Sequence, residues 1–221
     1  MTSRRKPSSP PFPELPSIPE ADGGSSVDVP HGVALKLTIS GRPGSGKSLV
    51  AKRVAAELGL RHVSAGDFMR EMAEERGMTI LELSRMAESG DEIDLEIDRR
   101  SARLSSAPIG FVMDARLGWH FVPGSVKVFL DVRPEVAAER IFAASRGSER
   151  ENLSLEATRK AIEERSASEV DRYTRYYGLD YTDPDNYDLV VDTSDLGPDE
   201  VVSRVLSYLG QVFEERNDEA E

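Results

Sequence analysis

The pattern of apolar and polar positions switches between strand-like and helix-like segments along most of the chain. Residues 33–40 (VALKLTIS) alternate apolar and polar side chains, as strands do. Short apolar runs predict four more strands, at 61–64, 109–113, 126–132 and 187–192. Apolar spacing with start and stop residues predicts helices at 47–58, 66–106 (broken at 77–79 and 89–91), from Pro134 onward, at 154–177 and at 198–213.

Strands separated by helices indicate an α/β fold in which helices cover both faces of a parallel sheet. We therefore predict a three-layer fold with a parallel five-stranded sheet. Ligands of such sheets bind at the carboxyl ends of the strands. The loops that follow the predicted strands are accordingly the first places to search for chemistry.

The two ends of the chain have a different composition from the segment between them. Residues 1–32 contain seven of the 13 prolines and the run Gly23-Gly24-Ser25-Ser26, so they offer little apolar surface to offset the entropy of ordering. We predict a disordered proline-rich tail there, an acidic tail at 214–221, and one folded domain at 33–213.

A glycine-rich loop follows the first predicted strand directly. Residues 41–48 read Gly-Arg-Pro-Gly-Ser-Gly-Lys-Ser, which fits G-x-x-x-x-G-K-[ST] at every fixed position. Such a loop turns backbone N–H groups toward phosphates, and the helix that follows adds the positive end of its dipole. Lys47 would reach the β- and γ-phosphates, and the Ser48 hydroxyl would bind Mg²⁺. The expected residues for binding the ATP donor are Gly41, Arg42, Pro43, Gly44, Ser45, Gly46, Lys47, Ser48 and Leu49.

Charge and composition exclude several other functions. The chain of 221 residues has a formal net charge of −12, which disfavours a nucleic-acid polymer or a membrane surface as the main partner. It contains no cysteine, so disulfides and cysteine-based zinc sites are excluded. His31, His62 and His120 lack metal-ligand spacing. There is no apolar run long enough for a transmembrane helix and no secretory signal, so we expect a soluble, cytoplasmic protein. We also expect it to be a monomer.

The segment after the second predicted strand resembles the nucleoside monophosphate kinases. It reads Ser64-Ala65-Gly66-Asp67-Phe68-Met69-Arg70, and in that family such a stretch opens the acceptor-binding helices, here 66–106. The likeness is strongest to the short, archaeal-type cytidylate kinases, from about residue 35 to about 210. It is carried by 62–67, Arg76-Gly77-Met78, Glu92-Ile93-Asp94 with Asp98-Arg99-Arg100, Arg172-Tyr173 with Tyr176-Tyr177-Gly178-Leu179-Asp180, and 187–194.

The resemblance implies roles for residues beyond the phosphate loop. Arg70 and Arg116 would contact the acceptor's phosphate. Asp114, at the end of the third strand, would bind Mg²⁺ through water or orient the acceptor, although a helix cap or salt bridge is an alternative. The sequence has Ala115 where the family usually has glycine. The implied acceptor-binding residues are Ser64, Gly66, Asp67, Arg70, Asp114, Arg116, Arg165, Glu169 and Arg172.

An arginine-rich region at 140–177 is the predicted lid. Arg165, Glu169 and Arg172 share one helix face through their i, i+4, i+7 spacing, which by itself is more typical of a salt-bridged helix surface than of a binding site. The resembling family carries a comparable face that touches the acceptor. Arg140 and Arg146 are further lid candidates, with Gly147-Ser148 as the tip, whereas Arg159 and Arg175 are expected to be solvated.

We therefore expect ATP- and Mg²⁺-dependent phosphorylation of CMP or dCMP by in-line transfer, with Lys47, Arg116, Arg165 and Arg172 as catalytic residues and Ser48 and Asp114 as metal ligands. The acceptor is already an anion, so no strong general base is required. Two alternatives remain open at this stage. One is another small P-loop kinase, adenylate kinase-like or dephospho-coenzyme A kinase-like, and the other is a nucleotide-binding regulatory module without catalysis.

Overall fold

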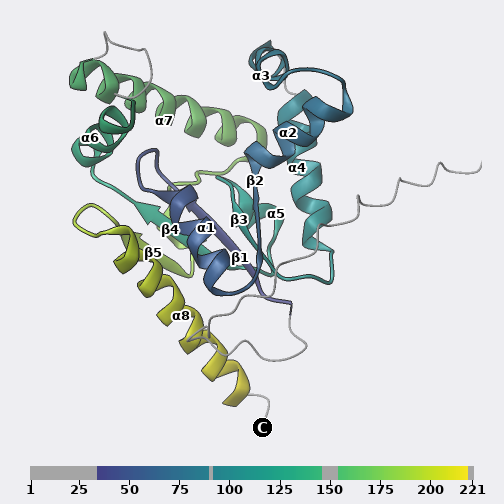
Figure 1. Cartoon of the computed structure of the whole chain (residues 1–221), viewed down its shortest axis with the longest axis vertical. Helices are drawn as coiled ribbons and strands as arrows, with labels where there is room; N and C mark the ends of the chain where they lie inside the picture. Colours follow the sequence, from purple (N-terminus) through teal and green to yellow (C-terminus); the bar gives the residue numbers. More distant parts are fainter. Residues whose placement is uncertain (1–33, 90–91, 146–153, 219–221) are drawn as a thin grey trace, which may run out of the picture.

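A parallel sheet of five strands lies at the centre of the molecule (Figure 1). The computed structural model describes residues 34–89, 92–145 and 154–218. The strands lie in the order β2-β3-β1-β4-β5, and every neighbouring pair is parallel. In chain order they are β1 (Lys36–Gly41), β2 (Arg61–Ser64), β3 (Phe111–Asp114), β4 (Val126–Asp131) and β5 (Leu189–Asp192). The predicted parallel five-stranded α/β fold is confirmed.

Both faces of the sheet are covered, which explains the alternating pattern of β1. Leu37 and Ile39 point to the face covered by α1 (Lys47–Glu57) and α8 (Pro198–Asp218), where neither side chain is exposed. Thr38 and Ser40 point to the other face, yet they are also buried. Their hydroxyls are satisfied there, by Ser125 Oγ at 2.9 Å and by the backbone carbonyl of Arg116 at 2.5 Å respectively. The polar positions of this strand are therefore buried and hydrogen-bonded, as a sheet with two covered faces requires.

Two helical groups overhang the carboxyl ends of the strands (Figure 1). One group consists of α2 (Ala65–Glu75), α3 (Ile80–Ser89) and α4 (Glu92–Ser105), which share a small core of Met72, Leu83 and Ile93. The other consists of α6 (Pro134–Ser145) and the long α7 (Leu155–Tyr177), which pack against each other. The short α5 (Gly118–Phe121) contacts β1 and α4. The carboxyl ends of the strands therefore lie beneath these two groups of helices (Figure 1).

The element boundaries follow the sequence prediction with a few differences. The predicted helical region 66–106 consists of three helices, and the predicted break at 77–79 is confirmed. The second predicted break, at 89–91, includes residues 90–91, which lie outside the described part of the chain. A 3-10 turn, η1 (Pro184–Asn186), precedes β5, which begins at Leu189 instead of 187. The Tyr187 hydroxyl donates to the Tyr181 carbonyl at 2.6 Å and its ring packs on Phe129, so Tyr187 belongs to the loop core.

The last helix is longer than predicted, since α8 continues past the buried Phe213 to Asp218. The first part of the segment predicted as an acidic tail, 214–221, is therefore helical. Glutamate and arginine are good helix formers, and no glycine or proline stops the helix there. The predicted proline-rich tail at 1–32 lies outside the described residues. Among the described helices, none has the length and apolar character needed to cross a membrane.

Candidate active site

The glycine-rich loop between β1 and α1 has a shape suited to a phosphate group. Gly44 has φ +79°, and a Cβ at this position would lie 2.7 Å from Ala137 Cα, so a side chain is excluded by both conformation and contact. Gly46 has φ +84° and is the N-cap of α1, with open space where a Cβ would point. Within the described residues no side chain caps α1, and the Leu49 N–H donates to the Gly46 carbonyl at 3.0 Å. The N–H groups of Lys47 and Ser48 are therefore the ones that an anion can bind.

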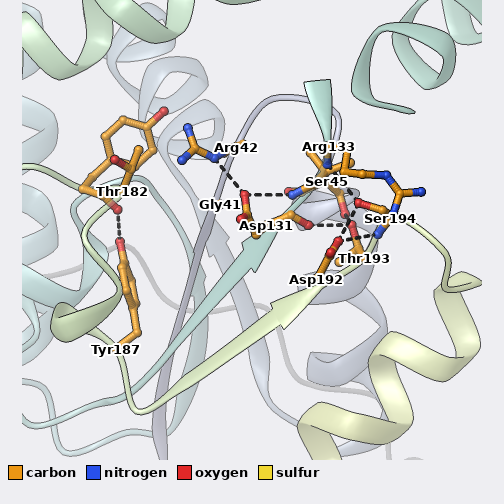
Figure 2. A network of polar contacts seen from close by, with 12 residues as sticks. Gly41, Arg42, Ser45, Asp131, Arg133, Thr182, Tyr187, Asp192, Thr193 and Ser194 are labelled. Carbon is orange, nitrogen blue, oxygen red and sulfur yellow. Dashed lines mark hydrogen bonds and ion pairs between the residues drawn. The ribbon is translucent and has the colours of Figure 1, made fainter. Parts of the chain in front are cut away.

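The loop is held in place by the ends of β4 and β5 (Figure 2). The buried Thr193 hydroxyl lies 3.2 Å from the Ser45 carbonyl and 2.9 Å from the Asp131 carbonyl. Arg42 Nε donates to Asp131 Oδ1 at 2.8 Å. These contacts join three strand ends, so the loop is positioned before any ligand binds.

Arg140 belongs to the same support. Its Nη1 lies 3.1 Å from Thr193 Oγ1 and 3.4 Å from the Gly44 carbonyl, and its Nη2 donates to the Thr193 carbonyl at 2.7 Å. The sequence predicted a mobile lid residue here. In the fold, the α6 helix brings the guanidinium against backbone carbonyls, and Arg140 connects the phosphate loop with the loop after β5.

Lys47 and Asp114 meet at the base of the site. Lys47 begins α1 and Asp114 ends β3, and their side chains form an ion pair. Asp114 is only 4% exposed. Burial, and next the positive charge of Arg116, lowers the pKa of Lys47 to about 7, and the negative charge of Glu169 acts against this shift. The salt-bridge alternative for Asp114 is therefore observed in this structure.

Arg116 and Glu169 form a second ion pair, which joins the end of β3 to the middle of α7. Arg116 Nε lies 2.7 Å from Glu169 Oε2 and Nη2 lies 3.3 Å from Oε1, while Nη1 donates to the Gly41 carbonyl at 3.0 Å. Tyr181 and Arg165 complete this cluster, since both donate to Glu169, at 3.2 and 3.0 Å. Burial raises the pKa of Glu169, but the hydrogen bonds and charges of Arg116 and then Arg165 outweigh burial and hold that pKa below its usual value.

Helix α4 meets α7 through two further contacts. Arg172 Nη1 donates to Asp94 Oδ2 at 2.8 Å, and its guanidinium lies 5.1 Å from the centre of the Tyr173 ring. One turn further along α4, the Tyr177 hydroxyl donates to Asp98. These contacts connect the predicted acceptor-binding helices with the predicted lid helix.

One cavity of about 340 Å³ connects these groups. Of the residues predicted from the sequence, six line it: Lys47, Asp114, Arg116, Arg165, Glu169 and Arg172. Its other polar and aromatic lining residues come mainly from α4, α5 and α7 and include Asp94, Asp98, Ser101, Phe121, Tyr173, Tyr176 and Tyr177.

The sequence analysis assigned no role to this second group, although a signal was present. Asp94, Asp98 and Ser101 have the same i, i+4, i+7 spacing on α4 that Arg165, Glu169 and Arg172 have on α7. What the spacing could not give is that these two helix faces oppose each other.

Four of the predicted acceptor-binding residues lie beside the cavity without lining it. Ser64 and Asp67 form a capping box at the start of α2, in which each side chain binds the other's backbone N–H. Arg70 is exposed and pairs with Asp67, close to Gly66. Their proposed contact with the acceptor therefore remains a prediction.

The lid is described only in part. Arg146 and the tip Gly147-Ser148 fall outside the described residues. Arg159 and Arg175 form exposed i, i+4 ion pairs on α7, with Glu163 and Asp171 respectively. Both are solvated, as the sequence predicted.

The residues present fit magnesium only together with a nucleotide. Within the described ranges there is no group of three or more histidine, aspartate or glutamate side chains that could hold a metal alone. Ser48 and Asp114 supply oxygen atoms, the donor type that Mg²⁺ prefers. Ser48 follows Lys47 in the sequence, and Asp114 is paired with Lys47 in the fold. Phosphate oxygens and water would have to complete such a site.

The fold and this site together define a P-loop protein of the small-kinase type. Shikimate kinase from Bacteroides thetaiotaomicron has a similar fold, with a TM-score of 0.53 and 15% identity over 81% of this chain and 98% of that one. The family model for the cytidylate kinase-like family matches residues 36–195.

Among curated proteins, cytidylate kinase from Methanopyrus kandleri is 39% identical over 82% of this chain and 96% of its own length. Cytidylate kinase from Natronomonas pharaonis is 41% identical over 75% and 84% respectively. The chain belongs to the cytidylate kinase-like family, and the family resemblance found in the sequence is confirmed.

Proposed function

We propose that this protein transfers the γ-phosphoryl group of ATP to the phosphate of CMP or dCMP. One observation carries the proposal: the loop lysine Lys47 and three arginines, Arg116, Arg165 and Arg172, line the same cavity. A lysine on a phosphate-binding loop serves the donor, and arginines across from it serve a second phosphate. The names of the relatives from Methanopyrus and Natronomonas support cytidine as the nucleoside.

On the donor side, the loop supplies a rigid set of N–H donors. Gly46 and the start of α1 would hold the β-phosphate, and Lys47 would bind the oxygens between the β- and γ-phosphates. Burial lowers the pKa of Lys47 to about 7, and the contact with Asp114 holds its side chain in place until the donor arrives. Magnesium, when bound with the nucleotide, neutralises phosphate charge, and Ser48 and Asp114 are the residues that would hold it.

On the acceptor side, the arginines are kept oriented by carboxylates. Glu169 pairs with both Arg116 and Arg165, and Asp94 pairs with Arg172. The acceptor's phosphate carries more negative charge than a carboxylate. It can therefore accept hydrogen bonds from guanidinium groups that are bound to Glu169 and Asp94 in its absence. The arginines thus enter the reaction already near their working positions, which lowers the cost of ordering them.

The chemical step then needs positioning and charge neutralisation. An oxygen of the acceptor phosphate attacks the γ-phosphorus as the bond to the β-phosphate oxygen of ATP breaks, which gives the nucleoside diphosphate and ADP. Lys47 faces the developing charge from the donor side, and Arg116 and Arg165 face it from the other side. Because the attacking oxygen is already an anion, none of the lining residues has to act as a strong base.

A coupled assay that detects ADP release decides between the candidates, with CMP, dCMP, UMP and AMP as acceptors. We expect CMP and dCMP to give the highest kcat/KM. A clear preference for AMP would support an adenylate kinase-like enzyme instead. ATP binding without transfer to any monophosphate would support a regulatory module.

A pair of lysine variants tests the donor site. Lys47→Ala is expected to lower kcat by about 10³-fold or more because it removes the charge that faces the transferred group. Lys52→Ala is the matched control, since Lys52 is exposed on the same helix and lies outside the cavity. Circular dichroism of both variants checks the fold. A Lys47→Ala variant with wild-type kcat would contradict the donor site.

A further inference from the structure

Three polar side chains of α4 face the cavity, and one of them forms no ion pair with any residue that the structure describes. Asp94, Asp98 and Ser101 all line it from one face of the helix. Asp94 is neutralised by Arg172, and the Ser101 hydroxyl donates to the Ile97 carbonyl at 2.9 Å. Asp98 appears in none of the ion pairs of the described residues, and the polar group that contacts it is the Tyr177 hydroxyl.

The Asp98 carboxylate is therefore a half-buried negative charge whose contact is with a neutral group. Burial raises the pKa of Asp98, and the nearby Asp94 adds to this, while the hydrogen bond from Tyr177 and the charge of Arg172 act against it. A carboxylate in this position gains from any hydrogen-bond donor that a ligand brings. One carboxylate can accept more than one hydrogen bond, so Tyr177 does not use up its capacity.

The surroundings of Asp98 suit a flat aromatic group. Leu95, Ile97 and Phe121 line the cavity around it. The Phe121 and Tyr177 rings meet edge to face, with centroids 5.7 Å apart and planes at 86°. Apolar and aromatic walls with a polar group at one edge are typical of sites that bind a heterocyclic base.

The distance from the arginine cluster also suits the two ends of one nucleotide. Glu169, which orients Arg116 and Arg165, and Tyr177, which contacts Asp98, are both on α7. Their separation of eight positions corresponds to about 12 Å along a helix. A phosphate at the arginines therefore leaves the base of the same molecule within reach of Asp98.

We propose that Asp98, positioned by Tyr177, accepts a hydrogen bond from the exocyclic amino group of the acceptor's base and so selects cytosine over uracil. The inference rests on the proposed function, because it concerns the acceptor of that reaction. Cytosine presents an amino group at C4, whereas uracil presents a carbonyl oxygen there. The Asp98 carboxylate can accept a hydrogen bond from the amino group of cytosine. With uracil, the carboxylate oxygen and the carbonyl oxygen at C4 repel each other, and neither receives a hydrogen bond.

The substitution Asp98→Asn tests this assignment directly. Asparagine keeps the size and one acceptor oxygen, but adds an N–H donor that can bind a carbonyl oxygen. We expect the ratio of kcat/KM for CMP to that for UMP to fall by at least about tenfold, with UMP improved in absolute terms. The matched control is Asp171→Asn on α7, an exposed residue paired with Arg175, which should leave the ratio within about twofold.

A second variant tests the positioning role of the tyrosine. Tyr177→Phe removes the hydroxyl that contacts Asp98 and keeps the ring that packs on Phe121. We expect the CMP to UMP ratio to fall by about two- to fivefold, since the carboxylate remains but is less well oriented. A purely structural clasp between α4 and α7 would lower both substrates equally and leave the ratio unchanged, which would overturn the proposal.

Ribose recognition is the other use that a carboxylate in a nucleotide site can have. The ratio of kcat/KM for CMP to that for dCMP distinguishes recognition of the ribose from recognition of the base. If Asp98→Asn changes this ratio and leaves the CMP to UMP ratio alone, Asp98 serves the sugar and the proposal is wrong. If the wild-type enzyme does not phosphorylate CMP, the proposed function itself is refuted. If the wild type prefers CMP and Asp98→Asn leaves the CMP to UMP ratio unchanged, only this inference is refuted.

Discussion

Arg116 and Glu169 lie 53 positions apart in the chain and form two parallel hydrogen bonds across the site, at 2.7 and 3.3 Å. Their side chains are only 14% and 12% exposed. The pair connects the carboxyl end of β3 with the predicted lid helix α7, so it fixes both the direction of Arg116, which we propose binds the acceptor, and the place of that helix. A bidentate, largely buried pair of this kind is far less screened than surface ion pairs.

Loss of Glu169 is therefore expected to affect stability and activity together. Glu169→Ala leaves the Arg116 guanidinium buried without its carboxylate, which should lower the free energy of unfolding by about 3 kcal/mol. The disoriented arginine should also lower kcat/KM for CMP by at least about tenfold. Urea unfolding and the coupled assay measure the two effects.

Glu163 provides the comparison on the same helix. It pairs with Arg159, and both side chains are about half exposed, at 54% and 44%. Glu163→Ala should change the free energy of unfolding by less than about 0.5 kcal/mol, as exposed pairs usually do. Equal losses in the two variants would mean that burial of the Arg116–Glu169 pair has no energetic consequence.

The same pair predicts a dependence of stability on pH. Because the pKa of Glu169 in the folded protein lies below the ordinary value of 4.5, its ionised form stabilises the fold at pH values above 4.5. That contribution is lost as the pH falls through the lowered pKa. The difference in unfolding free energy between the wild type and Glu169→Gln should be constant from about pH 5 to 8 and shrink below pH 4.5. A difference that grows in acid would show that the pKa of Glu169 is raised instead.

Thr193 is expected to control donor binding from outside the phosphate loop. Thr193→Val removes the hydroxyl that lies between the Ser45 and Asp131 carbonyls and Arg140, while it keeps the side-chain shape. A loss of about 1 kcal/mol in loop positioning would raise KM for ATP about fivefold. KM for CMP should stay within about twofold, because Thr193 is remote from the α4–α7 contacts.

Thr193→Ser keeps the hydroxyl and serves as the rescue variant. We expect its KM for ATP to be close to that of the wild type. If Thr193→Val raised KM for both nucleotides equally, the residue would support the whole domain and not the donor loop in particular. Steady-state kinetics with each nucleotide varied in turn distinguish these outcomes.

The donor loop could be predicted in detail because its information is local. The spacing of Gly41, Gly46, Lys47 and Ser48 is set by the backbone turn itself, and the structure has Gly44 and Gly46 at positive φ as that turn requires. Residues 64–67 show the limit of the same approach. Ser-x-x-Asp after a strand is both a family motif and a helix-capping pattern, and in the fold Ser64 and Asp67 form the cap of α2.

The opposite wall of the cavity was only half predictable. The i, i+4, i+7 spacing correctly places Arg165, Glu169 and Arg172 on one helix face, and all three line the cavity. That Glu169 would bind Arg116, or that Tyr177 would contact Asp98, cannot be read from spacing. These pairs depend on how α7 crosses the end of the sheet, which is a matter of long-range packing.

The predictions of a monomer and of a cytoplasmic location are tested by none of these observations and stay predictions.

The amino-acid sequence was sufficient for the order of strands and helices, the position of the glycine-rich loop and the family, because periodicity and motif spacing act over a few neighbouring residues. It was also sufficient to single out most of the charged residues of the site. The partners of those residues were fixed by packing, which brings the ends of β3, β4 and β5 and the faces of α4 and α7 together from distant parts of the chain. For that reason the roles of Asp98, Arg140 and Thr193 could be argued from their contacts in the folded protein and not from the sequence.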